Sequence, residues 1–122
     1  MTCTLDDDDL GGAWLRLAGE LDTATVPRVA HLLDAAEQFA RLIVVDLRQL
    51  TFMDSSGIHL LLDADRRAWA LGHRLIVVRG PAHVDRVFTL TGASETVEIV
   101  DPDTAQQTIE ALHHLAPANE TA

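Results

Sequence analysis

Lysine is absent from this chain of 122 residues, and all nine of its basic residues are arginine. The absence excludes Schiff-base chemistry, a P-loop lysine and a lysine partner for a phosphoryl group. Nineteen acidic residues against nine basic ones give a formal net charge of −10. A surface of this sign does not suit direct binding of nucleic acid or of an anionic membrane, and it favours a protein partner with basic patches.

Cysteine and long apolar runs are also scarce. Cys3 is the one cysteine, so an internal disulfide is excluded and a reducing compartment is expected. No apolar run approaches the roughly 18–20 residues that cross a bilayer, and the first residues do not have the pattern of a signal peptide. The length and the hydrophobic content of 48% predict one globular domain over residues 1–116, with residues 117–122 as a frayed tail.

Strand and helix patterns alternate along the chain. Two short strands, 2–5 and 13–17, predict a hairpin around an acidic turn at residues 6–9, and a helix capped by Thr25 follows from Pro27. The later pattern predicts strands at 42–47, 74–78 and 97–100, a connection at 48–54, and helices at 55–71, 81–92 and 102–115. Asp46 is expected near the end of its strand. The order β-β-α-β-α-β-α-β-α predicts an α/β fold with a small mixed sheet.

The segment 51–58 carries the most chemical information. It places the carboxylate of Asp54 and the hydroxyls of Ser55 and Ser56 at the start of a helix, directly after a buried strand. One interpretation is structural, because Asp and Ser cap the free N–H groups of a first turn. The other is regulatory, because a serine at this place is a suitable phosphorylation target, and a phosphoserine would add roughly −1.5 to −2 charges beside Asp54.

These residues are similar to a known signature. Phe52-Met53-Asp54-Ser55-Ser56-Gly57 closely resembles the signature of the bacterial anti-sigma factor antagonists, the STAS domains. Three further segments resemble the same family in the same order, namely Gly19-Glu20-Leu21-Asp22, Val45-Asp46-Leu47 and the stretch from Val84 to Gly92. The resemblance covers roughly residues 13–112. It implies a small mixed sheet, with an N-terminal hairpin followed by β-α units, and helices mainly on one face.

The resemblance also implies a function. Members of this family are cytoplasmic, noncatalytic proteins without a cofactor or a metal. The unphosphorylated form binds an anti-sigma factor with serine-kinase activity and so releases a sigma factor. Phosphorylation, here expected at Ser55, switches this binding off, and a serine/threonine phosphatase resets it. The residues expected to support the switch or bind the partner are Asp22, Asp54, Ser56, Gly57, Ile58 and His59, with a capping role for Ser56.

Two features of the predicted helix at 55–71 differ from a plain family pattern. His59 stands where many relatives have a small residue, so it either alters partner choice and pH sensitivity or is an exposed residue without a role. One helix face cannot bury all four apolar side chains of Ile58, Leu60, Leu61 and Leu62. Trp69, further along the helix, is another large apolar side chain that has to be covered or exposed. Either neighbouring helices cover them or they form an exposed apolar partner surface.

Other functions are weaker interpretations of the same residues. A response-regulator receiver needs a lysine that is absent, and a serine hydrolase needs a glycine that Met53-Asp54-Ser55 lacks. His59 and Asp63 make at best part of a metal site. The serious alternative is a STAS domain that is not phosphorylated and acts as a scaffold or a small-ligand-binding module of a stress-signalling complex.

Overall fold

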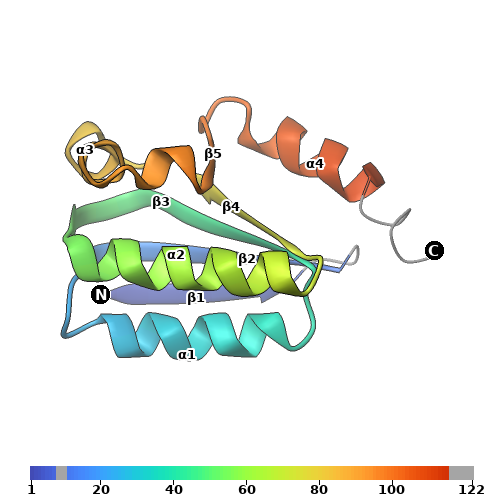
Figure 1. The fold of residues 1–122 in the computed structure, drawn as a ribbon, viewed down its shortest axis with the longest axis horizontal. Helices are drawn as coiled ribbons and strands as arrows, with labels where there is room; N and C mark the ends of the chain where they lie inside the picture. The colour runs from blue at the N-terminus through green and yellow to red at the C-terminus, as the bar shows by residue number, and fades with distance from the viewer. Residues whose placement is uncertain (8–10, 116–122) are drawn as a thin grey trace.

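The computed structural model describes residues 1–7 and 11–115 of the chain. Five strands form one sheet in the order β1-β2-β3-β4-β5 (Figure 1). Strand β1 is antiparallel to β2, and the remaining neighbours are parallel. The strands span Thr2–Asp7, Gly12–Leu21, Leu42–Met53, Arg74–Val78 and Glu98–Val100. The predicted α/β fold with a mixed sheet is therefore confirmed. Asp8 and Asp9 of the predicted acidic turn, and the predicted tail, lie outside the described residues.

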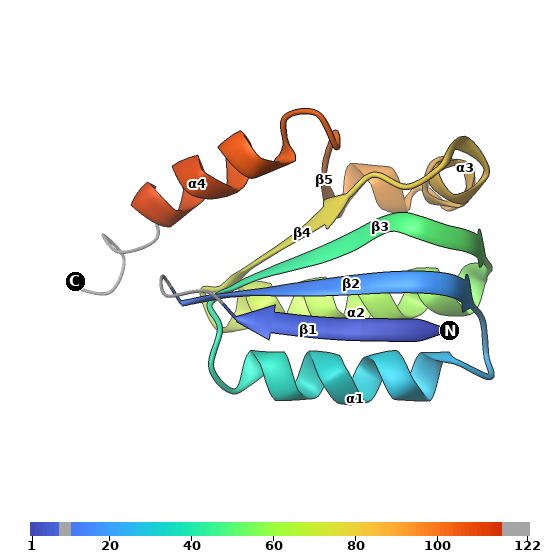
Figure 2. The same cartoon turned by 180° about the vertical axis from the view of Figure 1, so that it is seen from behind.

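Four helices accompany the sheet. They are α1 (Val26–Glu37), α2 (Ser55–Ala70), α3 (Ala82–Thr91) and α4 (Ala105–Leu115), and a short 3-10 turn, η1, covers Ala93–Glu95. Figure 1 shows α1 and α2 running side by side along the sheet, and Figure 2 shows the strands in front of α2 when the sheet is seen from behind. Helix α4 lies apart from the other three, beside β4.

Two apolar clusters on opposite faces of the sheet explain this arrangement. The main core joins one sheet face to α1, α2 and α3, and its most deeply buried members include Leu15, Leu17, Val45, Val77, Leu33, Leu61 and Phe88. The smaller cluster on the other face joins Leu42, Val44, Ile76 and Val78 to Ala105 and Ile109 of α4. Strand β3 is apolar on both sides because both of its faces are covered at this end. Helices thus cover mainly one face, as predicted.

Strand β3 is longer than the pattern predicted. The segment 48–54 was expected to be a connection, but β3 continues to Met53 and pairs with β2 through Leu50 and Phe52. Register shifts interrupt the pairing between β2 and β3, so the buried residues Leu50 and Met53 are three positions apart and not two. A pattern search for strict alternation misses such a segment.

The starts of two helices also differ from the prediction. Thr25 stands at the N-cap position of α1, but its hydroxyl donates to the carbonyl of Glu20 at 2.8 Å and caps no first-turn N–H. Helix α4 begins at Ala105, later than expected, and the carboxylate of Asp101 accepts a hydrogen bond from Arg79 Nε at 2.8 Å. In both cases the side chain expected to cap the helix bonds to another group.

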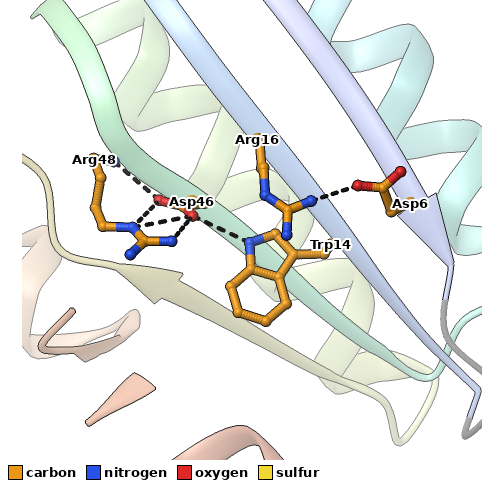
Figure 3. Close-up of polar contacts among 5 residues, drawn as sticks. All are labelled: Asp6, Trp14, Arg16, Asp46 and Arg48. Carbon is orange, nitrogen blue, oxygen red and sulfur yellow. Dashed lines mark hydrogen bonds and ion pairs between the residues drawn. The ribbon is translucent and has the colours of Figure 1, made fainter. Parts of the chain in front are cut away.

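Asp46 lies within β3 and not near its end, which corrects the sequence prediction. Its side chain is buried and points to the sheet face opposite the main core (Figure 3). Arg48 binds both carboxylate oxygens, with Nη2 at 2.7 Å, and the indole N–H of Trp14 donates to the same group at 3.2 Å. Arg16 stacks over the Trp14 ring and pairs with Asp6. Asp46 therefore anchors a polar cluster that links three strands.

Candidate functional site

The Asp54–Gly57 segment lies at the edge of the sheet where parallel strands β2 and β3 both end. Leu21 and Met53 are paired at the last positions of the two strands, and the N–H of Asp54 donates to the carbonyl of Leu21 at 3.2 Å. The connection after β2 therefore lies beside the connection after β3. This brings Asp22 to the same edge as Asp54 and Ser55, as is usual for sites at the carboxyl ends of parallel strands.

Asp54 is the N-cap of α2. Its Oδ1 accepts a hydrogen bond from the backbone N–H of Ser56 at 2.9 Å and another from the Ser56 hydroxyl. These bonds stabilise the ionised carboxylate, so the pKa of Asp54 lies below its ordinary value, with the side-chain bond from Ser56 as the main cause. The capping role expected for Ser56 thus belongs to Asp54, and the Ser56 hydroxyl serves to hold that cap in place.

Ser55 differs from its neighbour. It is the first residue of α2, and its side chain is exposed. Within the described residues its hydroxyl makes no hydrogen bond, whereas the hydroxyl of Ser56 is held by Asp54. Of the two serines in the segment, Ser55 presents the free nucleophilic oxygen.

Gly57 and Ile58 are buried, so they contribute to the site by packing α2 against the sheet. A Cβ added at Gly57 would lie 2.8 Å from Met53 Cγ and 2.9 Å from Leu21 Cδ2, and only glycine lets α2 approach the strand ends this closely. Ile58 is 2% exposed and belongs to the main core. Neither side chain is available for a direct contact with a partner in this conformation.

Asp22 shapes the connection that follows β2. Its Oδ1 accepts from the backbone N–H groups of Ala24 at 3.0 Å and Thr25 at 3.1 Å. The backbone N–H of Asp22 in turn donates to the Thr25 hydroxyl at 3.0 Å. Asp22 therefore holds a tight turn beside Asp54, and it adds a second carboxylate to this edge. Within the described residues, neither carboxylate takes part in an ion pair.

The apolar side chains of α2 are mostly covered. Ile58, Leu60 and Leu61 are buried, which contradicts an exposed apolar surface formed by these three residues. The outward face of the helix is instead formed by Ser55, His59, half-buried Leu62, Arg66 and Trp69. Trp69 is 77% exposed, but it lies near the end of α2 remote from Ser55.

Two residues at this edge were not predicted. Phe52 is 45% exposed although it stands in a strand next to the site. The ring of His83, from the first turn of α3, lies with Nε2 2.6 Å from the carbonyl oxygen of Thr51 and so links α3 to the end of β3. Phe52 and Thr51 belong to the last residues of β3. The sequence pattern ended this strand too early, so neither the exposure of Phe52 nor the contact of His83 was expected.

Three other features bear on function: metal-ligating groups, membrane-spanning helices and cavities. No group of three or more His, Cys, Asp or Glu side chains suited to a metal ion occurs among residues 1–7 and 11–115. No helix in that part of the chain has the length and apolarity needed to span a membrane. A cavity of about 480 Å³ lies between the start of β1 and α1, where it is lined by Met1, Thr2, Cys3, Arg28, His31 and Leu32.

The comparisons with known proteins agree with this geometry. Residues 7–111 match the model of the STAS domain. The chain is 27% identical over 84 residues to an anti-sigma-B factor antagonist of Listeria monocytogenes, which covers 68% of this chain and 74% of the relative. It is 34% identical over 80 residues to an anti-sigma F factor antagonist of Lysinibacillus sphaericus, over 64% of this chain and 68% of that protein.

Solved structures share the fold. The anti-sigma factor antagonist SpoIIAA in its unphosphorylated form has a TM-score of 0.76 at 26% identity, over 90% of this chain and 97% of that one. An anti-sigma factor antagonist from Mycobacterium paratuberculosis has a TM-score of 0.74 at 23% identity, over 89% of this chain and 93% of that one. The family model, the relatives and the strand order lead to one conclusion: the chain belongs to the STAS domain family.

Proposed function

We propose that this protein is an anti-sigma factor antagonist whose binding to an anti-sigma factor is switched off by phosphorylation of Ser55. The names of the similar proteins support the first half of the proposal. The switch is supported by SpoIIAA, a protein that has been solved in an unphosphorylated and in a phosphorylated form.

The free hydroxyl of Ser55 is the observation that carries the proposal. Ser56 is bound to Asp54, so only Ser55 offers an exposed, unbonded oxygen at the start of α2. A kinase transfers the γ-phosphoryl group of ATP to this oxygen, which forms a P–O bond at Ser55 and releases ADP and one proton. The chain itself acts as the substrate and binding partner and not as the enzyme.

Charge explains how one phosphate changes binding. The phosphoryl group adds roughly −1.5 to −2 charges at neutral pH. It does so at an edge that already holds Asp22 and Asp54, in a chain of net charge −10. A partner that fits the neutral hydroxyl of Ser55 closely must then desolvate and accommodate a dianion, which is costly unless it offers new cations.

The partners follow from this scheme. They are an anti-sigma factor with serine-kinase activity, which binds and phosphorylates Ser55, and a serine/threonine phosphatase, which removes the phosphate. The expected compartment is the cytoplasm, where ATP and sigma factors act. Asp54, Ser56 and Asp22 shape the surface around Ser55, Gly57 and Ile58 hold α2 against the strands, and Phe52 adds exposed apolar area.

A binding assay tests the proposal. The anti-sigma factor of the source organism is titrated with wild-type protein, Ser55→Ala and Ser55→Asp, and Ser56→Ala serves as the matched control. Wild type and Ser55→Ala should bind, Ser55→Asp should bind at least tenfold more weakly, and only the Ser55 variants should resist phosphorylation by the kinase. Loss of binding in a folded Ser55→Ala protein, or phosphate found on Ser56, would contradict the assignment.

The cavity beside β1 supports a second candidate, a STAS domain that binds a small ligand and is not phosphorylated. Its lining includes the basic side chains of Arg28 and His31. Phosphosite mapping after incubation with ATP and a lysate of the source organism separates the two functions. Phosphate on Ser55 supports the switch, whereas unmodified protein under several growth conditions supports the ligand-binding module.

A further inference from the structure

His59 lies on the same outward face of α2 as Ser55. Both side chains are exposed, and the two positions are four residues apart in one regular helix. Residues with this spacing have Cβ atoms roughly 5–6 Å apart. Helical side chains also lean toward the N-terminus, so the side chain of His59 has the turn that carries Ser55 within its reach.

His59 has no competing partner in the described part of the chain, where it forms neither a hydrogen bond nor an ion pair. Helix α2 packs against α1, α3, β3 and β4. Most charged side chains of these elements are bound to others, in the pairs Glu37–Arg67, Asp85–Arg79, Asp46–Arg48, Arg74–Glu98 and Asp63–Arg66. The remaining charged or titratable groups are Arg28, His31 and Asp34 on α1, Asp65 on α2, and His83 and Arg86 on α3, and none of them bonds to His59.

The charges near Ser55 are negative, so a phosphate at Ser55 needs a positively charged partner. Asp54 and Asp22 stand at the same edge and would repel a phosphate, and no arginine pairs with either carboxylate within the described residues. His83 is the other histidine at this edge, but its ring is bound to the carbonyl of Thr51. His59 is therefore the side chain on the first two turns of α2 that can carry a positive charge and is free to turn toward a phosphate on Ser55.

We propose that His59 is the counter-ion of the phosphoryl group on Ser55 and makes the charge of the phosphorylated switch depend on pH. The inference rests on the proposed function, because it assumes that Ser55 carries the phosphate. The protonated imidazole donates a charge-assisted hydrogen bond to a phosphate oxygen. The phosphorylated end of α2 then gains about one negative charge in place of about two.

The pH range in which the ion pair forms follows from the ionisation of the phosphoserine and of the histidine. A phosphoserine loses its second proton near pH 6, and an ordinary histidine gains one near pH 6.5. Pairing lowers the value of the phosphate and raises that of the histidine, so the range in which both groups are charged extends beyond these two values on either side. At more alkaline pH the imidazole is neutral and the pair weakens. Both negative charges of the phosphate are then uncompensated.

An NMR titration tests the pair without a kinase or a partner. The full chain is made with phosphoserine incorporated at position 55 during synthesis, and the histidine ring signals are followed from pH 5 to 9 with and without the phosphate. The midpoint of the His59 signal should move to higher pH by about 1 unit, a tenfold gain in proton affinity. His31, on the neighbouring helix, serves as the control histidine and should not move. A His59 midpoint that moves no more than that of His31 overturns the proposal.

The variant His59→Gln gives a second measurement. Its exposed position predicts that it folds as the wild type does. The phosphorus-31 titration of the phosphoserine should have a lower midpoint in the wild type than in His59→Gln, because a protonated imidazole favours the dianion. Equal midpoints overturn the pairing. Neither titration involves the anti-sigma factor, so their failure is distinguishable from a failure of the proposed switch, which the binding assay reports.

Discussion

Replacement of Asp46 by asparagine tests the polar cluster on the sheet face opposite the main core. Asp46 is 4% exposed, and four N–H groups donate to its carboxylate: the backbone N–H, Nε and Nη2 of Arg48 and the indole of Trp14 (Figure 3). Asparagine keeps the shape but removes the charge, and it turns an amide NH₂ toward groups that are themselves donors. At least one charge-assisted bond is lost and one donor is left facing another.

The magnitude follows from those bonds. A hydrogen bond to a charged group contributes about 1.5–3 kcal/mol, so Asp46→Asn should lower the free energy of unfolding by about that amount. The matched control is Asp6→Asn, which removes the same group from an ion pair with Arg16 whose side chains are 57% and 46% exposed. That pair is open to solvent, so the control should lose at most about 1 kcal/mol.

Urea denaturation at pH 7 and at pH 3 measures both effects. Burial acts to raise the pKa of Asp46, but the bonds from Arg48 and Trp14 prevail and hold it below the ordinary value. A lowered pKa means that the carboxylate contributes stability above its unfolded pKa and loses it as the pH falls through the folded pKa. The difference between wild type and Asp46→Asn should therefore shrink at strongly acid pH. Equal losses in Asp46→Asn and Asp6→Asn at pH 7 would refute the reasoning.

Three further substitutions test the packing of α2. Gly57→Ala should lower the free energy of unfolding by about 1–3 kcal/mol, because the new Cβ meets Met53 and Leu21, and urea denaturation should show it. Gly72→Ala should lower the free energy of unfolding by about 1 kcal/mol from its φ of +71° alone, since no atom beyond the adjoining residues lies within 4 Å of the new Cβ, and a larger loss would contradict the open space. Burial raises the pKa of Asp65, so its ionisation opposes folding and stability falls as the pH rises through that pKa. Asp65→Asn should be more stable than the wild type at pH 7 but not at pH 3 in thermal unfolding, and no gain at pH 7 would contradict this sign.

The sequence by itself determined the features that depend on neighbours along the chain. The element order followed from apolar periodicity, and the end of α2 near Gly72 and of α3 at Gly92 followed from residues that adopt positive φ at little cost. The start of α2 at Ser55 was likewise readable, because Asp54 caps through a bond to a residue two positions away. These interactions are local, so the residue types alone carry them.

Tertiary structure decided what depends on partners far along the chain. Strand β3 continues to Met53 with register shifts against β2, and Asp101 forms an ion pair with Arg79, 22 positions away. Asp46 is buried because Trp14, 32 positions away, and the neighbouring Arg48 satisfy its carboxylate. No periodic pattern records such contacts, since each is set by the alignment of separate strands and helices.

The candidate site divides in the same way. Its motif and its place at a helix start were visible in the sequence, together with Ser55, Asp54 and Asp22 as its polar residues. Only the folded chain separates the exposed ring of His59 from the buried side chain of Ile58. The reason is physical: a helix face is exposed or buried according to what packs against it, and that is fixed when α2 docks on the strand ends.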